Sequence, residues 1–502
     1  MNQEQHHDRA YWIKWGIALL IPVVTYFWTG TTDLSPEAQR FLTFTFCALA
    51  IWTLNILPEP FVAMILPIIY IVTGVGKPSQ ILSAWSGSAG WLVLSGLFIA
   101  EVMSSTGIAK RIAVWSIKLT GGSFHFLLWG FMLAGYIMAP FIPTVTGKAA
   151  IFAILAVGIC KGFNIQPCSK EAPTLVIGAL LAVAIPKLAF LSAGVDVAMA
   201  MGLYAQATGT PISWSAYFLH NFPPSLLYAA LSIYTLLFIM RPKLSFDLET
   251  FIREEYETLG PMSLREKKAL ILLGLLLLSL VTDQIHKIDA GWMMLMIASL
   301  AFFPGFSLLD KKSLSNIPYQ QVFFVVGCMT IGGAAKASGV DKVIADLLMP
   351  LLSGGELYTS FSTFVSGIIL NFLFTPIAAF SAMTAPLVEM ASQMNMSPLA
   401  LVYSFSYGVD QYLFPYEFVV TLYFYSTGYI KLSHFMTIFA VRMVLAGAFL
   451  ALCFTLTGNS SAFFRDIQIW SIGILINANY QYPYGLFYIS DIFFYNFKEK
   501  IL

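Results

Sequence analysis

Charged side chains are scarce in this sequence. Aspartate, glutamate, lysine and arginine make up 11% of its 502 residues, against about 25% in soluble domains, while 58% of the residues are hydrophobic. Because a water-soluble core cannot hide so large an apolar fraction, the chain is expected to lie in a lipid bilayer. The 27 basic and 26 acidic residues nearly cancel, which excludes both a basic face for nucleic acid and an acidic tail for a cationic partner.

Cysteine and histidine are also few. The five cysteines lie far apart, mostly inside apolar runs, and their spacing predicts neither a disulfide framework nor a zinc site. The six histidines are scattered and form no HExxH motif. We therefore expect no cofactor, and the histidine pattern argues against a metal-dependent membrane enzyme.

Apolar runs long enough to cross a bilayer core of about 30 Å recur along the chain. They predict eleven membrane spans, near residues 14–30, 41–57, 59–76, 88–106, 172–205, 222–240, 268–285, 289–305, 320–337, 398–424 and 432–457. The polar N-terminus carries Arg9 and Lys14, and no evident cleavage site follows it. It is therefore expected to be a cytoplasmic tail.

Two further apolar stretches, 124–162 and 357–393, are interrupted by proline and threonine. The interruptions lie at Pro140, Pro143, Thr144 and Thr146, and again at Thr375 and Pro376. Non-helical backbone is tolerated at membrane depth only where protein or a water-filled cavity covers it. We interpret both stretches as re-entrant hairpins and as the first place to look for a binding site; ordinary kinked spans are the alternative.

An internal repeat supports the hairpins. Residues 91–113 recur in outline at 322–345. The landmarks keep their spacing, since 37 residues separate Gly107 from Thr144 and 36 separate Gly339 from Thr375. In each half a long apolar run follows, interrupted near residues 192–197 and near 410–421. Corresponding broken segments in two halves are a sequence pointer to the binding site of a transporter.

The longest hydrophilic connection divides the two halves. Its basic residues next to the flanking spans place it in the cytoplasm, and an odd number of crossings in each half gives the repeats opposite topology. The predicted organisation is an N-terminal tail and first helix at 1–35, a first repeat at 36–240 with a cytoplasmic-side hairpin at 124–162, a cytoplasmic connector at 241–267, a second repeat at 268–457 with an opposite-side hairpin at 357–393, and a tail without an assigned role at 458–502.

Four motifs carry a family resemblance. They read PTVTGKAAI at the first hairpin tip, FTPIAAFSAMTAP at the second, FLSAGVDVAMA at the first break and FPYEFVVTLYFYSTGYIKL at the second break. In order and spacing over about residues 10–457, the chain resembles the divalent-anion/sodium symporter family of dicarboxylate carriers and di- and tricarboxylate exchangers. The resemblance implies an all-α integral membrane protein of about eleven transmembrane helices and two re-entrant hairpins in two inverted-topology repeats. It also implies a homodimer, and we expect it in a bacterial inner membrane.

The sequence departs from the family at its Ser-Asn-Thr signature. The residues over the two triplets are Thr144, Val145 and Thr146 at the first tip and Thr375, Pro376 and Ile377 at the second. The asparagine amide is thus missing from both tips. Lys148 stands where exchanger-like members carry an arginine, which favours exchange over sodium symport; a lysine that reaches the cytoplasmic interface is the alternative.

The expected function is secondary active transport of a small organic anion, such as a di- or tricarboxylate, by alternating access. Hairpin tips present helix N-termini that suit a carboxylate, and unwound carbonyls suit a coupling cation. The predicted substrate-binding residues are Thr144, Val145, Thr146, Lys148, Thr375, Pro376 and Thr421. The candidates for coupling to sodium or protons are Ser192, Asp196, Asp410 and Glu417, and a sodium ion near Thr144 and Thr375 is a further possibility.

Several alternatives stay open. Anion exchange and ion-coupled transport both fit, with sodium-coupled dicarboxylate symport as the main alternative. Asp196 is either a titratable coupling group or a solvated residue in a water-filled break. Asp410 and Glu417 share roughly one helical face if their helix is continuous, where they suit a cation or protons. A polytopic membrane enzyme, a channel and a relative that no longer transports are the other classes. The role of Lys187, which lies beside Pro186, is left undecided.

Overall fold

The computed structural model describes residues 9–54, 56–120, 123–242 and 248–457. Within these ranges the regular structure is helical and contains no strand, which confirms the predicted all-α membrane class. Seven of the described helices are long and apolar enough to cross a membrane, and four shorter apolar helices accompany them. These lengths leave the predicted number of spans open, and the tail predicted at 458–502 lies outside the described residues.

The chain begins with three packed helices. They are α1 (Arg9–Thr29), α2 (Pro36–Thr53) and α3 (Glu59–Val72). Ser35 starts α2, because its hydroxyl accepts a hydrogen bond from the Ala38 amide at 3.1 Å and satisfies a donor left over in the first turn. The hydroxyls of Thr45 and Tyr70 join α2 to α3 at 2.7 Å.

The first half continues to residue 240. Its helices are α4 (Pro78–Ile81), α5 (Ser88–Thr106), α6 (Ile108–Thr120), α7 (Phe124–Met138), α8 (Val145–Gly162), α9 (Glu171–Ala184), α10 (Val195–Thr208) and α11 (Trp214–Met240). Short 3₁₀ turns, η1 (Leu82–Ser86) and η2 (Pro186–Ala189), precede α5 and follow α9. Helices α7 and α8 form the first predicted hairpin, and the chain between α9 and α10 forms the first break.

The second half follows the same order. Helix α12 (Leu248–Thr258) lies in the connector. The helices that follow are α13 (Leu264–Val281), α14 (Asp283–His286), α15 (Ala290–Ser299), α16 (Lys311–Asn316), α17 (Gln320–Ser338), α18 (Val340–Leu352), α19 (Glu356–Leu373), α20 (Pro376–Gln393), α21 (Pro398–Val409), α22 (Val419–Tyr425) and α23 (Leu432–Thr457), with 3₁₀ turns η3 (Leu300–Phe302) and η4 (Pro415–Glu417). Helices α19 and α20 form the second hairpin, and the chain between α21 and α22 forms the second break.

Equivalent landmarks of the sequence repeat have the same local structure. Gly107 ends α5 with φ 80° and Gly339 ends α17 with φ 73°, a left-handed backbone that favours glycine. A short amphipathic helix comes next in each half, α6 or α18, and then a hairpin. Thr144 is the N-cap of α8 and Thr375 is the N-cap of α20. The inverted topology and the domain boundaries stay predictions.

Glycines let each hairpin approach the helix that leads into a break. A Cβ atom on Gly135 of α7 would collide with the Ala182 carbonyl of α9. In the second half a Cβ atom on Gly367 of α19 would lie 2.7 Å from the Phe405 carbonyl of α21. Small residues permit such backbone contacts between membrane helices, where no hydrophobic effect drives association.

A buried arginine anchors the connector between the halves. Arg111 of α6 is 7% exposed, and its Nε donates to Glu266 Oε1 of α13 at 2.6 Å. The other guanidinium nitrogens donate to the carbonyls of Gly260 and Leu259 at 3.0 Å each. A planar fork of donors suits this set of acceptors, so the end of the connector is held against α6.

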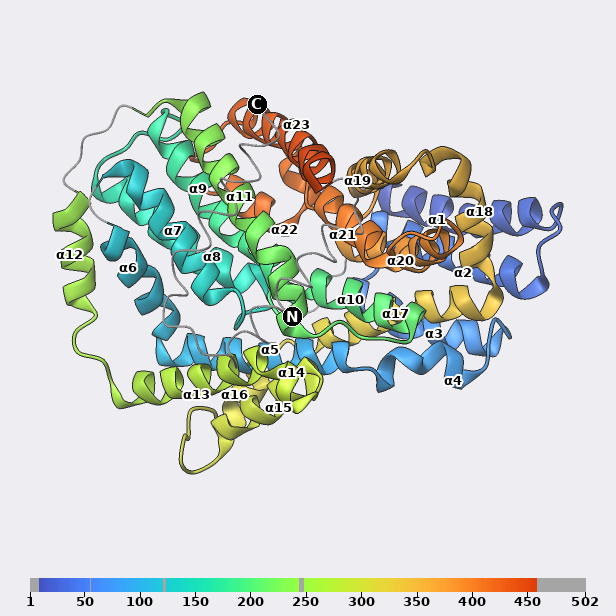
Figure 1. Cartoon of the computed structure of the whole chain (residues 1–502), viewed down its shortest axis with the longest axis horizontal. Helices are drawn as coiled ribbons and strands as arrows, with labels where there is room; N and C mark the ends of the chain where they lie inside the picture. The colour runs from blue at the N-terminus through green and yellow to red at the C-terminus, as the bar shows by residue number, and fades with distance from the viewer. Residues whose placement is uncertain (1–8, 55, 121–122, 243–247, 458–502) are drawn as a thin grey trace.

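The two hairpins lie on opposite sides of the molecule, with the broken segments between them (Figure 1). Helix α8 of the first hairpin packs against α9 and also against α22, which follows the second break. Helix α20 of the second hairpin packs against α21 and also against α10, which follows the first break. Each hairpin therefore contacts the broken segments of both halves.

Candidate functional site

The first break begins where Pro186 follows α9. The 3₁₀ turn Pro186–Ala189 leads into extended backbone at Phe190, and α10 begins at Val195. The break is therefore wider than the sequence predicted, because it starts at the proline rather than near residue 192. Lys187 lies inside it and is 1% exposed.

Ser192 fixes the extended part of the first break. Its hydroxyl donates to the Pro140 carbonyl of the first hairpin tip at 2.7 Å and accepts from Trp214 Nε1 at 3.1 Å. The side chain is 1% exposed. Ser192, predicted as a coupling candidate, therefore joins the first tip to the first break and to the start of α11.

The second break runs from Asp410 to Phe418. Glu417 accepts hydrogen bonds from the backbone amides of Leu413 at 3.2 Å and Phe414 at 2.8 Å. Its other oxygen lies 3.4 Å from the Asn371 amide of α19. These contacts make Glu417 a cap for a tight turn within the break.

Thr421 also holds this break together. Its hydroxyl donates to the carbonyls of Pro415 at 2.8 Å and Phe418 at 2.6 Å, and the side chain is fully buried. The predicted substrate-binding role for Thr421 stays a prediction. In this conformation the two bonds already use the only donor of its side chain.

A buried lysine joins the two breaks. Lys187 Nζ lies 2.7 Å from Asp196 Oδ2 and 3.1 Å from Asp410 Oδ1. Asp410 is 2% exposed, and its Oδ1 also accepts from the Tyr412 hydroxyl at 3.1 Å. Taking charges out of water is costly unless they are paired and hydrogen-bonded, and here one ammonium pairs an acid from each half.

Arg442 of α23 closes this network. Its Nη2 donates to Asp410 Oδ2 at 3.2 Å, and its guanidinium lies 4.8 Å from the centre of the Tyr228 ring. The residue is 1% exposed, yet its Nε and Nη1 have no hydrogen-bond partner among the described residues. A buried donor left without an acceptor costs about 1–3 kcal/mol, so this side chain retains capacity for a further acceptor.

Lys148 enters the first break from the hairpin. It lies one turn into α8, is 1% exposed, and donates through Nζ to the Ala193 carbonyl at 3.0 Å. No carboxylate of the described residues lies within ion-pair distance of this nitrogen. The alternative, a lysine that reaches the cytoplasmic interface, therefore does not describe this conformation, because the amine points into the break and is not solvated.

The hairpin tips themselves are more open. Thr144 is half-buried, Thr146 and Thr375 are exposed, and Pro376 is buried. Neither Thr144 nor Thr375 caps its helix with its side chain. The first amides of α8 therefore lack a side-chain acceptor, whereas α20 begins with Pro376, which has no N–H group. The prediction that the ligand lies directly between the two tips stays untested.

Sequence reasoning missed two residues of this network. Lys187 was left without a role and Arg442 was not considered. Both lie in apolar surroundings, and an ionisable residue inside a membrane helix is a functional candidate by default. That signal alone would have marked Arg442, which interrupts the apolar helix α23.

A sequence model described as "Sodium:sulfate symporter transmembrane region" matches residues 9–458. The chain belongs to this family. The predicted resemblance is confirmed, and the protein is a membrane transporter rather than an enzyme. It moves anions by secondary active transport.

The curated relatives have low sequence identity to this chain, but they align with most of it. An uncharacterized transporter of Haemophilus influenzae is 24% identical over 415 residues, which cover 78% of this chain and 86% of the relative. The L-tartrate/succinate antiporter of Escherichia coli K12 is 23% identical over 400 residues, covering 74% of this chain and 80% of the antiporter.

A solved structure shares the fold. The crystal structure of the Alcanivorax borkumensis YdaH transporter, described as having an unusual topology, matches with a TM-score of 0.51 at 13% identity. The match covers 74% of this chain and 87% of that one.

Proposed function

We propose that the chain exchanges small dicarboxylates across a bacterial inner membrane, with the anion bound where the first hairpin tip meets the two breaks. The proposal rests on Lys148, a buried cation whose ammonium has the Ala193 carbonyl as its only hydrogen-bond partner in the described structure. Burying an unpaired charge is strongly unfavourable. A substrate carboxylate supplies the missing countercharge.

The start of α8 supports the same position. Thr144, Val145, Thr146 and Gly147 form its first turn and N-cap, and no side chain caps them. Free amides and the helix dipole favour an anion at such a terminus. Val145 and Thr146 then contribute backbone N–H groups, which makes the loss of the family's asparagine less consequential.

Hydrogen-bonding capacity, beyond the single positive charge of the site, favours a substrate with two carboxylates. The four-residue network of Lys187, Asp196, Asp410 and Arg442 is neutral by itself, and Lys148 adds one positive charge. The two unpaired nitrogens of Arg442 offer a place for a second carboxylate. The name of the E. coli relative, an L-tartrate/succinate antiporter, fits substrates with two carboxylates.

Exchange is favoured over sodium symport by Lys187. Its ammonium already lies between Asp196 and Asp410, so these acids need no external cation in this conformation. Sodium-coupled symport is the second candidate. It is supported by the hydroxyls of Thr144 and Thr375, which make no capping hydrogen bond to their helices. We also propose a cytoplasmic N-terminus and a homodimer, as the family resemblance implies.

Counterflow in reconstituted vesicles tests this function. Vesicles loaded with unlabelled succinate, tartrate, citrate or sulfate are placed in labelled succinate, once with sodium and once with choline. We expect internal succinate or tartrate to accelerate uptake several-fold in both media. Uptake that requires a sodium gradient and ignores the internal anion would replace exchange by symport, and no uptake of labelled succinate under any loading condition would overturn the proposal.

A further inference from the structure

The Lys148 ammonium is held by a backbone carbonyl of another segment. Its Nζ donates to the Ala193 carbonyl at 3.0 Å, and the side chain is 1% exposed. Lys148 lies in α8, whereas Ala193 lies in the first break. A lysine ammonium sits on a flexible four-carbon stem. Its direction therefore depends on what fixes the backbone around Ala193.

The backbone around Ala193 forms a turn between α9 and α10. The Ala193 amide donates to the Phe190 carbonyl at 3.1 Å, and the chain is extended on both sides, at Phe190 and at Gly194. Residues 190–194 lie outside the helices, so helical hydrogen bonds do not hold them. Buried backbone outside regular structure needs partners from elsewhere in the molecule.

Helix α11 supplies these partners. Trp214 Nε1 donates to the Ser192 hydroxyl at 3.1 Å, and the Tyr217 hydroxyl donates to the Leu188 carbonyl at 3.1 Å. The Trp214 ring also stacks on the Phe190 ring, with the ring centres 5.8 Å apart. One helix thus holds the chain before the turn and within it.

The Ser192 hydroxyl links the turn to the first hairpin tip. It accepts from the Trp214 indole, which is 1% exposed and has a single N–H donor. Its own proton goes to the Pro140 carbonyl at 2.7 Å. The tip continues into α8, which carries Lys148. The same hydroxyl therefore fixes both the carbonyl that holds the ammonium and the start of the helix that bears it.

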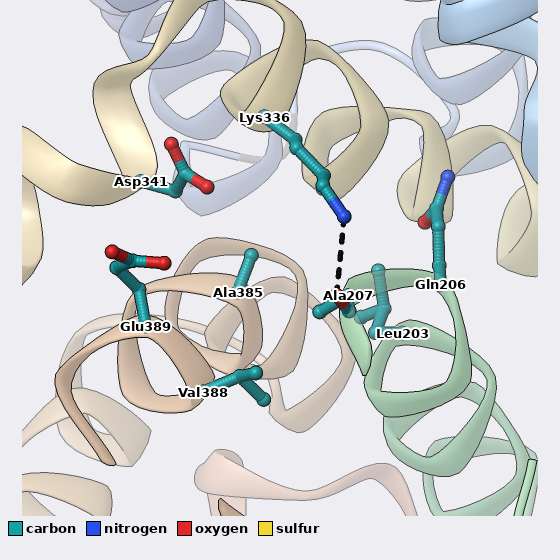
Figure 2. Close-up of a pocket in the computed structure, with 9 residues that line it drawn as sticks. Leu203, Gln206, Ala207, Lys336, Asp341, Ala385, Val388 and Glu389 are labelled. Carbon is teal, nitrogen blue, oxygen red and sulfur yellow. Dashed lines mark hydrogen bonds between the residues drawn. The ribbon is translucent and has the colours of Figure 1, made fainter. Parts of the chain in front are cut away.

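Helix α10, which follows the turn, is held at its other end. Figure 2 shows Lys336 of α17 beside the last turn of α10, where its Nζ donates to the Ala207 carbonyl at 3.1 Å. Gln206 Nε2 donates to the Ser83 hydroxyl at 2.5 Å. These contacts anchor α10 without reaching the turn, so the position of the turn depends on α11.

We propose that Ser192 and Trp214 are positioning residues for the transported anion. They fix the Ala193 carbonyl, and this carbonyl holds the Lys148 ammonium inside the first break. Both act through that carbonyl, and neither contacts the substrate. A binding group whose supporting contacts are removed is held too loosely and loses affinity. The proposal rests on the proposed function, because it takes Lys148 as the countercharge of the substrate.

Binding of labelled succinate to the purified protein tests this role. Ser192→Ala removes both hydrogen bonds of the hydroxyl, and Trp214→Phe keeps an aromatic ring but removes the N–H donor. Each variant should raise the Kd for succinate about two- to tenfold, the range that one neutral hydrogen bond is worth. The number of binding sites and the unfolding midpoint are measured on the same samples.

Thr45→Val is the matched control. It removes a buried hydroxyl that lies 2.7 Å from the buried Tyr70 hydroxyl, between α2 and α3. It therefore leaves an aromatic residue without its partner, as Ser192→Ala does, but in a different pair of helices. A loss of stability alone lowers the midpoint and the number of folded sites. We expect this control to keep the wild-type Kd.

Counterflow kinetics in membrane vesicles give a second readout that needs no purified protein. Ser192→Ala and Trp214→Phe should raise the KM for succinate more than they lower the maximal rate, whereas loss of folded protein lowers the maximal rate at constant KM. This measurement decides the question for a variant that does not survive purification.

Two results separate this proposal from the proposed function. Wild-type Kd and KM in both Ser192→Ala and Trp214→Phe, together with loss of binding in Lys148→Met, would overturn the positioning role alone. Wild-type affinity in Lys148→Met would overturn the positioning role and the proposed function together.

Discussion

Replacing Asp410 with asparagine tests whether the buried network holds the two breaks together. The carboxylate is 2% exposed and accepts from Lys187, Tyr412 and Arg442 at 3.1 to 3.2 Å. An amide keeps the shape but leaves Arg442 without a carboxylate and Lys187 with Asp196 alone. Removing one partner of a buried ion pair costs about 3–5 kcal/mol, and we expect Asp410→Asn to lower the free energy of unfolding by this amount.

The companion variant Arg442→Met should lower the free energy of unfolding by less than Asp410→Asn does. Asp410 then keeps Lys187 and Tyr412 as donors, so the loss is that of one charged hydrogen bond, about 1.5–3 kcal/mol. The double variant leaves no guanidinium without a carboxylate. Its cost should therefore fall short of the sum of the two single variants by about 0.5–3 kcal/mol.

Denaturant unfolding in mixed micelles, followed by tryptophan fluorescence, measures these free energies. Asp346→Asn serves as the control, because it removes an exposed aspartate and should change stability by no more than about 0.5 kcal/mol. Strictly additive costs would refute the coupling between Asp410 and Arg442, and an Asp410→Asn variant as stable as the control would refute the network as a structural link between the halves.

Three further substitutions have defined outcomes. Gly135→Ala should lower the free energy of unfolding by about 1–3 kcal/mol, because the added methyl group collides with α9. Its control, Gly158→Ala in open space of α8, should be neutral or stabilising. Equal unfolding midpoints of the two variants would contradict the close contact. Arg111→Lys loses the fork to Glu266 and should speed chymotrypsin cleavage of the connector, whereas Lys110→Met, which removes an exposed pair, should not. Ser192→Ala strands a buried indole donor and should lower the free energy of unfolding by about 1–3 kcal/mol; an unchanged value would show that water replaces the hydroxyl.

Composition and periodicity predicted much of this fold. The apolar fraction alone required a membrane protein, and proline or threonine interruptions located both hairpins. The glycines at 107 and 339 were informative because their left-handed backbone leaves few alternatives. Helices α6 and α18 were not predicted, since their charged residues interrupt the apolar runs by which spans are recognised.

The candidate site was predicted only in part. Lys148, Asp196 and Asp410 were proposed from the sequence, but the connection between the two acids was not, because it depends on Lys187 approaching a residue of the other half. No local pattern encodes a contact so distant along the chain. Likewise, the two carbonyl contacts of Thr421 require the tight turn at Pro415, which a continuous helix would not contain.

Direct binding of a labelled dicarboxylate to the purified protein tests the central claim most sharply. Wild-type protein and Lys148→Met are compared in a scintillation proximity assay with labelled succinate, and Lys161→Met, an exposed lysine of the same helix, is the control. We expect saturable binding by the wild type and the control, and affinity at least tenfold weaker in Lys148→Met. Equal affinity in all three proteins would contradict the assignment of the buried lysine as the substrate's countercharge.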